Sequence, residues 1–407
     1  MTDQRGYPGR EGKDAMTVPV TKGAEDRKPG GRRREVRLDV FRGLALIFIF
    51  LDHIPSNALN WLTIRNFGFS DASEAFVFIA GYSAVLAYGR RIDDLGVPFV
   101  TARIYKRCWQ LYVAQLLLFM VFTAQVAYTA ATFNNPMYSE EMGIVRFFDE
   151  PHVTLLEAML LRFRPTNMDI LPLYIVLLLL FPFILLGLRR WPAGTAVLSL
   201  AAYGAANLFG WNLSTWPEGV WLFNPLAWQA LFVAGAAAGL AHGRDWLRPW
   251  RRTAFWVALL YLGFAFLIVL TWHSAVLESY VPTVVGTILY PIDKTNLSPS
   301  RLLHFLALAY VAVRLIPGDA PLLSWAVWRP VIRCGQHPLE IFCLGVFLSF
   351  AAHMLLVEWS GSLWAQTAVS LAGIGVMVAT AYYLSWYRAM EKAASAGRTA
   401  KGEGGRA

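Results

Sequence analysis

Apolar residues fall into long runs along this chain, and short polar segments separate the runs. A helix rises about 1.5 Å per residue, so roughly 20 apolar residues cross the hydrocarbon core of a bilayer. The runs begin after residue 37 and show neither an internal repeat nor inverted halves. The pattern predicts ten membrane-spanning helices, at about residues 38–57, 72–90, 108–131, 168–188, 191–210, 225–242, 253–272, 300–316, 336–357 and 364–386.

Composition supports this pattern. Of the 407 residues, 56% are hydrophobic and 15% are charged, which is typical of a polytopic membrane protein rather than of several soluble domains. We therefore predict an all-α membrane helix bundle. The formal net charge of +9 does not indicate nucleic-acid binding, because the basic residues gather in short segments between apolar runs. The three cysteines have no metal or redox spacing, so neither a metal site nor a disulfide is expected.

The basic residues also orient the predicted helices. Lys and Arg are enriched on the cytoplasmic side of membrane proteins, and ten crossings return both termini to one side. We predict cytoplasmic termini, with a disordered basic tail over 1–36, a membrane domain over 37–390 and a flexible tail over 391–407. No cleaved signal peptide is expected before the first helix. With this topology, only six of the 36 basic residues lie outside: Arg65, Arg146, Arg162, Arg164, Lys294 and Arg301.

Two predicted outer segments are long. Residues 133–167 contain the amphipathic stretch HVTLLEAMLLRF, which could lie on the membrane surface. Residues 273–299 are rich in Pro, Thr, Ser and Tyr. Loops of this length suit a lid or a polymer-binding rim, and the alternative is that they only cover helix ends.

Arg42 and His53 are eleven positions apart on the first predicted helix. At about 100° per residue they lie nearly on one face, roughly 16 Å apart along the axis. Ionisable groups at membrane depth usually mark a functional site. His53, near the outer end, is predicted to act as a general base, since an imidazole titrates near neutral pH. The alternative is an interfacial histidine without a catalytic task.

Three carboxylates lie at the same predicted depth as His53. Asp52 precedes it, while Asp71 and Glu74 open the second predicted helix. Asp52 or Glu74 is expected to orient the imidazole. For Asp71 the alternative is a helix cap, because the sequence from Ser70 to Glu74 resembles a capping box.

Two more outer residues are candidates for substrate contact. Arg65 could bind the distal carboxylate of a dicarboxylic acyl group, or it is simply a charge on a loop surface. His353, near the outer end of the ninth predicted helix, could share the site of His53. Alternatively, it is an interhelical histidine held by a hydrogen bond.

A basic cluster is predicted at the opposite, inner face. Arg42 lies near the inner end of its helix, and Arg103, Lys106 and Arg107 open the third helix. Together they could hold phosphate groups, which arginine binds through paired donors. Each of them could instead be a topological anchor that extends to the membrane surface. HExxH, P-loop, GxSxG and dinucleotide-binding motifs are not found.

The stretch from Leu38 to His53, with Arg42-Gly43 inside it, resembles the first-helix motif of the acyltransferase-3 superfamily of membrane acyltransferases. Residues 76–83, FVFIAGYS, resemble the second-helix signature of that superfamily, with Ala80 in place of Ser. Residues 103–107 resemble its basic third-helix start. More closely, residues 37–84 and the stretch CGQHPLEIFCLGVFLSF resemble the OpgC protein family.

This resemblance implies a specific activity. OpgC-type proteins are multi-pass enzymes of the bacterial inner membrane that add succinyl groups to osmoregulated periplasmic glucans. The donor implied is a cytoplasmic acyl-CoA, succinyl-CoA in particular, used as a co-substrate with no permanently bound cofactor. His53 matches the catalytic histidine, and Arg42, Arg103 and Arg107 match basic positions near the donor.

We hypothesise direct acyl transfer, in which His53 takes a proton from a glucan hydroxyl that attacks the thioester. Trp, Tyr or backbone N–H groups are possible oxyanion donors. A mechanism through a covalent acyl-enzyme is an open alternative. The rival hypothesis is a proton-coupled transporter or flippase for a saccharide or acyl carrier. A scaffold subunit for glucan synthesis is a third possibility. The sequence does not define the acyl group, the acceptor sugar or the oligomeric state.

Overall fold

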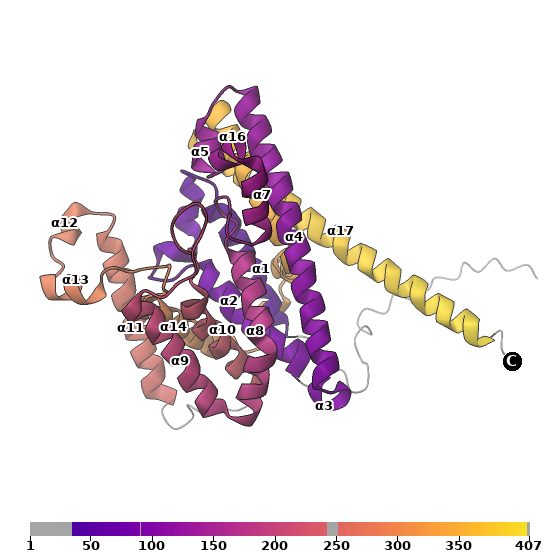
Figure 1. The fold of residues 1–407 in the computed structure, drawn as a ribbon. Helices are drawn as coiled ribbons and strands as arrows, with labels where there is room; N and C mark the ends of the chain where they lie inside the picture. The colour runs from indigo at the N-terminus through magenta and orange to yellow at the C-terminus, as the bar shows by residue number, and fades with distance from the viewer. Residues whose placement is uncertain (1–34, 90, 242–250, 405–407) are drawn as a thin grey trace, which may run out of the picture. The chain divides into compact units, whose positions relative to one another are not determined.

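The computed structural model of the chain describes residues 35–89, 91–241 and 251–404. Throughout this part of the chain the regular structure is helical, with one isolated β-bridge between Ser214 and Val220 (Figure 1). The prediction of an all-α protein is confirmed. Residues 1–34 of the predicted disordered tail lie outside the described residues.

Every predicted apolar run corresponds to a helix. Most ends agree within about six residues, but the third helix begins eleven residues early, at Val97, and the tenth ends 18 residues late, at Gly404. Arg103 and Arg107 therefore lie one to three turns inside that helix rather than at its start. The main helices are α1 (Val36–Asp52), α2 (Ala72–Ala84), α4 (Val97–Thr132), α8 (Ile170–Arg190), α9 (Pro192–Phe209), α10 (Pro225–Leu240), α11 (Arg251–Thr271), α14 (Pro299–Leu315), α16 (Pro338–Glu358) and α17 (Leu363–Gly404).

Short helices connect these long ones. Residues 151–159 of the predicted amphipathic stretch form α7, and a helix break at His337 separates α15 from α16. The short elements are η1 (Ala58–Leu62), η2 (Ile64–Asn66), η3 (Val85–Gly89), α3 (Arg91–Leu95), α5 (Met137–Glu141), α6 (Val145–Asp149), α7 (Pro151–Met159), α12 (Ala275–Glu278), α13 (Thr283–Leu289), η4 (Pro321–Ser324) and α15 (Trp328–Gln336).

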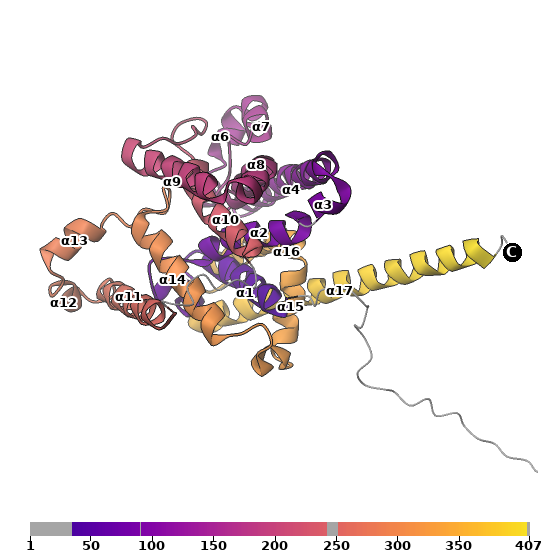
Figure 2. The same ribbon diagram turned by 90° about the horizontal axis from the view of Figure 1, so that it is seen from below.

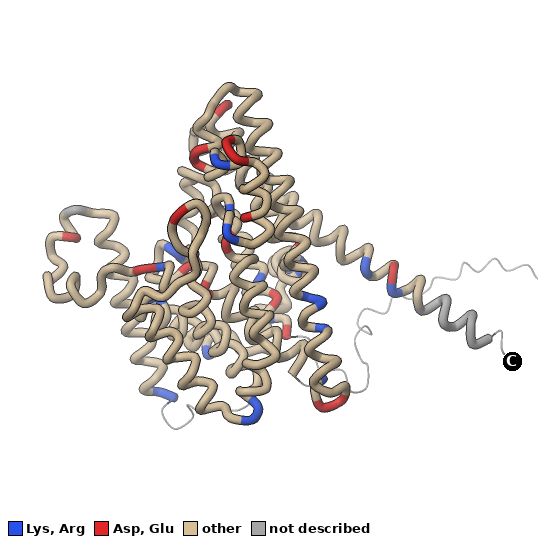
Figure 3. Tube along the Cα trace, viewed as in Figure 1, with Lys and Arg blue, Asp and Glu red and all other residues tan. Residues whose placement is uncertain are grey.

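The apolar helices indicate a membrane-embedded protein. Six helical stretches within the described residues are long and apolar enough to cross a bilayer: Ala72–Leu95, Val97–Thr132, Ile170–Arg190, Arg251–Thr271, Pro338–Glu358 and Leu363–Ser395. Charged residues lie mainly near helix ends, with long uncharged stretches between them (Figure 3). The other predicted spans, α1, α9, α10 and α14, are 16 to 18 residues long. Ten crossings and cytoplasmic termini therefore stay predictions.

The C-terminal residues are helical well beyond the last predicted span, and the flexibility expected of this tail stays a prediction. Helix α17 continues without a break as far as Gly404, so residues 391–404 are helical. Ala, Glu, Lys and Arg predominate there, and all four favour helix formation. Arg388 of α17 pairs with Glu340 of α16, with 2.6 Å between the guanidinium and the carboxylate.

Helices α1 and α2 lie at the centre of the bundle (Figure 2). Helix α2 packs against α10, and α1 packs against α15, α16 and α2. Both main contacts depend on glycine. A Cβ atom at Gly81 or Gly235 would lie 2.1 Å from a backbone oxygen of the facing helix, and one at Gly335 of α15 would lie 1.9 Å from the Asp39 oxygen. Only small residues allow helices to approach so closely.

We expect Gly235→Leu to push α10 away from α2 and destabilise the protein by at least about 1–3 kcal/mol, the usual cost of overpacking. Thermal unfolding of the purified protein in detergent measures this effect. Gly263→Leu is the matched control, because a Cβ atom at this α11 position meets nothing within 4 Å. An unchanged unfolding temperature for Gly235→Leu would contradict the role given to this contact.

Candidate active site

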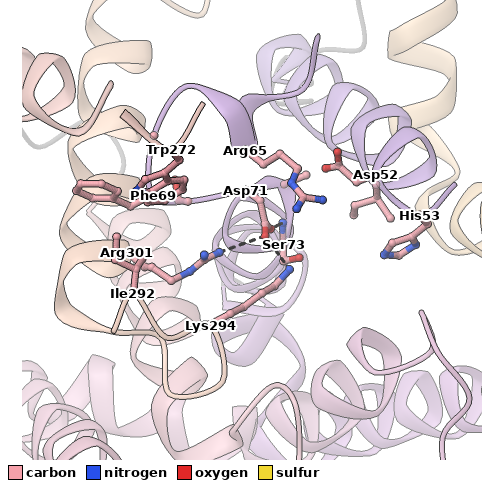
Figure 4. Close-up of a pocket in the computed structure, with 14 residues that line it drawn as sticks. Asp52, His53, Arg65, Phe69, Asp71, Ser73, Trp272, Ile292, Lys294 and Arg301 are labelled. Atoms are coloured by element: carbon pink, nitrogen blue, oxygen red, sulfur yellow. Dashed lines mark hydrogen bonds and ion pairs between the residues drawn. The ribbon is translucent and has the colours of Figure 1, made fainter. Parts of the chain in front are cut away.

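A cavity of about 290 Å³ lies where the C-terminal end of α1, the start of α2, the end of α11 and the start of α14 come together (Figure 4). Phe69 and Trp272 form part of its wall. The cavity brings together ionisable residues from four separate parts of the chain: Asp52, His53, Arg65, Asp71, Lys294 and Arg301. Such a concentration of charge beside apolar helices indicates a functional site.

The end of α1 places His53 at this cavity. Its backbone N–H still donates to the Ile49 carbonyl at 3.0 Å, so His53 continues the helical hydrogen bonding of α1. Pro55 follows, and a proline in this position cannot continue a helix. Asp52 accepts a hydrogen bond from the Thr63 hydroxyl at 2.8 Å, which fastens the helix end to the next segment.

The imidazole of His53 has no hydrogen-bond partner among the described residues. Its Nδ1 atom is buried and unpaired. No described residue makes a hydrogen bond to Nε2 either, and His53 is one of the residues that line the cavity. Neither Asp52 nor Glu74 makes the expected orienting bond to the ring.

Asp71 caps α2 and holds two cations. One carboxylate oxygen, Oδ1, accepts from the Ser73 N–H at 2.8 Å, and Glu74 accepts from the Asp71 N–H at 2.8 Å, which completes a capping box. The other oxygen of Asp71 accepts from Lys294 at 2.7 Å and from Arg301 at 3.1 Å. Asp71 therefore caps α2, as the alternative prediction had it, and it also lines the cavity.

Glu74 is fully buried, with 0% of its surface exposed, and it pairs with Arg301. Its Oε1 accepts from Nε of Arg301 at 2.8 Å and from the terminal nitrogen Nη2 at 2.6 Å. Because Oε2 is engaged by the Asp71 N–H, both oxygens have partners. Glu74 thus anchors α14 to α2, and it does not line the cavity as an imidazole-orienting group would.

These ion pairs set the charge state of Asp71. Burial alone would raise the pKa of the Asp71 carboxyl, but the charges of Lys294 and Arg301 hold that pKa well below its usual range. Asp71 is therefore ionised at every physiological pH. We name Asp71, Glu74, Lys294 and Arg301 the charge network.

Lys294 is held by the fold of its own loop. Asp293 accepts backbone hydrogen bonds from Thr295 at 2.8 Å and from Asn296 at 3.0 Å. The buried Trp228 indole donates to the Lys294 carbonyl at 3.1 Å. This turn directs the Lys294 side chain toward Asp71 (Figure 4).

Sequence reasoning missed two cations and one histidine of this region. The rarity of basic residues in the predicted outer segments is the signal that could have pointed to Lys294 and Arg301. The histidine is His304, whose Nδ1 lies 2.7 Å from the Ser70 hydroxyl and so holds the residues just before Asp71. Only the tertiary structure brings Ser70 and His304 together.

Arg65 lines the cavity from η2, and its guanidinium has no hydrogen bond or ion pair with any described residue. The side chain lies near Asp52 and Asp71 in the close-up (Figure 4). Lys294 and Arg301, in contrast, each form an ion pair with a carboxylate. Arg65 is thus a cation that a bound anion could engage.

At the other end of α1, Arg42 ties three helices together. One terminal nitrogen, Nη1, donates to the Gly335 carbonyl of α15 at 3.1 Å and to Asp39 at 3.5 Å. The other, Nη2, donates to the Ser83 hydroxyl of α2. Arg42 and His53 therefore lie at opposite ends of one helix, as predicted.

The other predicted donor-site residues lie on α4. Arg103 is exposed and Arg107 is half-buried. Arg107 donates to Gln110 at 3.2 Å, and the Arg103 guanidinium lies 6.0 Å from the centroid of the Phe99 ring. Both contacts stay within α4, so a phosphate site shared with Arg42 stays a prediction.

His353 lies apart from the cavity lining. Its Nε2 atom is 2.9 Å from the Glu141 carboxylate of α5, and its ring packs edge-on against Tyr138. This arrangement fits the alternative that His353 is a hydrogen-bonded histidine between helices, here joining α16 to α5. The expectation that it shares the site of His53 has no support in these contacts.

The apolar helices and the ionisable cavity define the chain as a polytopic membrane protein with an enzyme-like site at one end of α1. A model of the OpgC protein family matches residues 34–389, and the chain belongs to this family. Membership implies an acyltransferase-type enzyme. A search of curated proteins finds no match to the chain.

We expect Asp71→Asn to lower the free energy of unfolding by about 1–3 kcal/mol at pH 7, because Lys294 and Arg301 lose a charged partner. The pKa of Asp71 is about 3.9 when unfolded and lower when folded, so the ion pairs contribute fully above about pH 5 and lose their contribution as the pH falls. Thermal unfolding from pH 7 to pH 3 should show the wild-type advantage shrinking toward acid pH.

Asp149→Asn is the control for this experiment, because Asp149 is exposed and makes no ion pair with a described residue. A wild-type advantage over Asp71→Asn that grows toward acid pH would contradict the depressed pKa. Asn at position 71 can still cap the helix, so the comparison isolates the charge.

Proposed function

We propose that this protein is an O-acyltransferase of the bacterial inner membrane that moves an acyl group from cytoplasmic acyl-CoA to hydroxyl groups of a periplasmic glucan. The observation that carries the proposal is that His53 lines a cavity at one end of α1 while its imidazole makes no hydrogen bond to a described residue. Membership of the OpgC family supports the reaction class. The acyl group that we propose is succinyl.

His53 is the proposed general base. A glucan hydroxyl in the cavity donates its proton to Nε2 while its oxygen attacks the thioester carbonyl. The tetrahedral intermediate collapses with cleavage of the C–S bond, and the CoA thiolate takes the proton back from the imidazolium. A positioned base of this kind is normally worth a factor of about 10²–10⁴ in rate.

The donor is proposed to enter from the opposite end of α1. Acyl-CoA carries its thioester on a long flexible arm and its phosphates at the other end. Arg42, Arg103 and Arg107 are the proposed contacts for the phosphates, since arginine binds phosphate through paired donors. The arm would then extend beside α1 toward His53, so that neither large substrate has to cross the membrane.

Arg65 is the proposed contact for the distal carboxylate of the succinyl group. It lines the cavity with His53, and no described carboxylate engages it. Two parallel N–H donors of a guanidinium match the two oxygens of a carboxylate. The cations of the charge network are already neutralised by Asp71 and Glu74, which makes Arg65 the better partner for an anion.

We expect His53→Ala to lower glucan acylation by about 10²–10⁴-fold. The assay follows release of free CoA from succinyl-CoA by the purified protein in lipid nanodiscs, with and without glucan. His152→Ala, a change of an exposed histidine on α7, should leave the rate unchanged. Residual activity of His53→Ala above about one part in ten would exclude His53 as the principal base.

The same assay separates the proposal from a transport function. A transporter or flippase moves its substrate without cleaving a thioester, and so it would release no CoA in the presence of glucan. Glucan-dependent release by the wild-type protein supports acyl transfer, and its absence would overturn the proposed function.

We expect Arg65→Gln to raise the KM for succinyl-CoA by about tenfold or more, the value of a charged hydrogen bond, and to spare acetyl-CoA. The measurement compares kcat/KM for the two donors in each variant. Arg146→Gln removes another exposed outer arginine and should change neither value. An equal loss with both donors would show that Arg65 does not recognise the carboxylate.

A further inference from the structure

Four partly exposed aromatic side chains form a chain of contacts that reaches the cavity wall through Trp272. We name Trp61, Trp272, His273 and Tyr290 the aromatic rim. Trp272 is 44% exposed and also forms part of the cavity wall, while Trp61 is 51% exposed and Tyr290 is 46% exposed. Rings of this size normally bury most of their surface, so their joint exposure beside a functional cavity needs an explanation.

The rim is continuous and built from distant parts of the chain. The Trp61 ring lies 4.3 Å from the His273 ring, between ring centroids. His273 follows Trp272, whose indole N–H donates to the Tyr290 hydroxyl. Trp272 also packs against the buried Phe69, which shares the cavity wall. These contacts fix the rings relative to the cavity that holds His53.

Rigid aromatic faces next to polar groups are suited to sugar rings. The C–H groups of a pyranose lie on its faces and pack on an aromatic surface, while its hydroxyl groups project from its edge toward polar partners. Here the polar partners are the charged residues of the cavity. A belt of aromatic residues at the membrane surface also exposes Trp and Tyr, but such a belt does not require one ring to line the cavity of a base.

We infer that the aromatic rim is the subsite for the acceptor glucan, and that it holds sugar units next to the one whose hydroxyl reaches His53. This inference rests on the proposed function and adds the residues that bind the polymer. Trp272 stacks on the sugar nearest the cavity, and Trp61 with His273 supports a unit further along the chain. The ordered rings lower the entropy cost of holding a flexible glucan.

The test uses the full-length protein in nanodiscs with unsubstituted periplasmic glucan as the probe. We expect Trp272→Ala and Trp61→Ala each to raise the KM for glucan by about 3- to 10-fold. The value of kcat and the KM for succinyl-CoA should not change, since the rings bind substrate and transition state alike. Trp272→Phe and Trp61→Phe, which keep a stacking face, should recover most of the affinity.

Trp359→Ala is the matched control. Trp359 is 86% exposed, follows α16 and does not line the cavity. A membrane-anchoring role for the rim would give a different result, in which the rim variants insert poorly but keep the glucan KM of the wild type. An unchanged glucan KM in both alanine variants, with wild-type folding, would overturn the inference.

Equilibrium binding of glucan in the absence of any acyl donor separates this inference from the proposed function. If the wild type binds glucan and the rim variants bind it more weakly, but no CoA is released, the subsite stands and the acyl-transfer proposal fails. If CoA release depends on glucan while binding is equal in all variants, the reaction stands and the aromatic rim is not its subsite.

Discussion

An ion-pair network of two carboxylates and two cations determines how the region around the cavity is built. Glu74 and Arg301 in this network are buried, and Asp71 and Lys294 are half-buried. Asp71 and Glu74 at the start of α2 face Lys294 and Arg301 from segments more than 200 residues away. An isolated charge at such a site is very costly, and removing one partner of a buried pair strands the other. The start of α2, the loop before α14 and α14 itself must therefore assemble together.

The charge network also decides which groups are left for chemistry. Lys294 and Arg301 neutralise Asp71 and Glu74, so neither carboxylate serves the imidazole. His53 and Arg65 stay unengaged by side chains of the described residues and share the same cavity. Side chains without hydrogen-bond partners, held beside residues whose hydrogen bonds and ion pairs are satisfied, are typical of sites preorganised for a ligand.

Much of the fold could be predicted from the sequence, because helix length and apolar periodicity are local properties. The ten helical segments, the helix that joins Arg42 to His53 and the cap at Asp71 all follow from neighbouring residues. The pairing of Glu74 with Arg301, and of His353 with Glu141, could not be predicted in this way. Such pairs depend on which helices pack together, and glycines such as Gly81 and Gly235 control that packing through backbone contacts that no periodicity reveals.

The pairing of the cations around the cavity has a consequence for turnover in the proposed reaction. Arg162 pairs with Glu157, Arg164 with Asp169, and Lys294 and Arg301 with Asp71. A glucan that gained a dicarboxylic acyl group would change from a neutral polymer to an anion. Arg65 lines the cavity without such a partner among the described residues, so the guanidinium proposed to receive the donor's carboxylate would also hold that of the product. The proposed reaction would then be slowed by its own product, which competes with the next donor for Arg65.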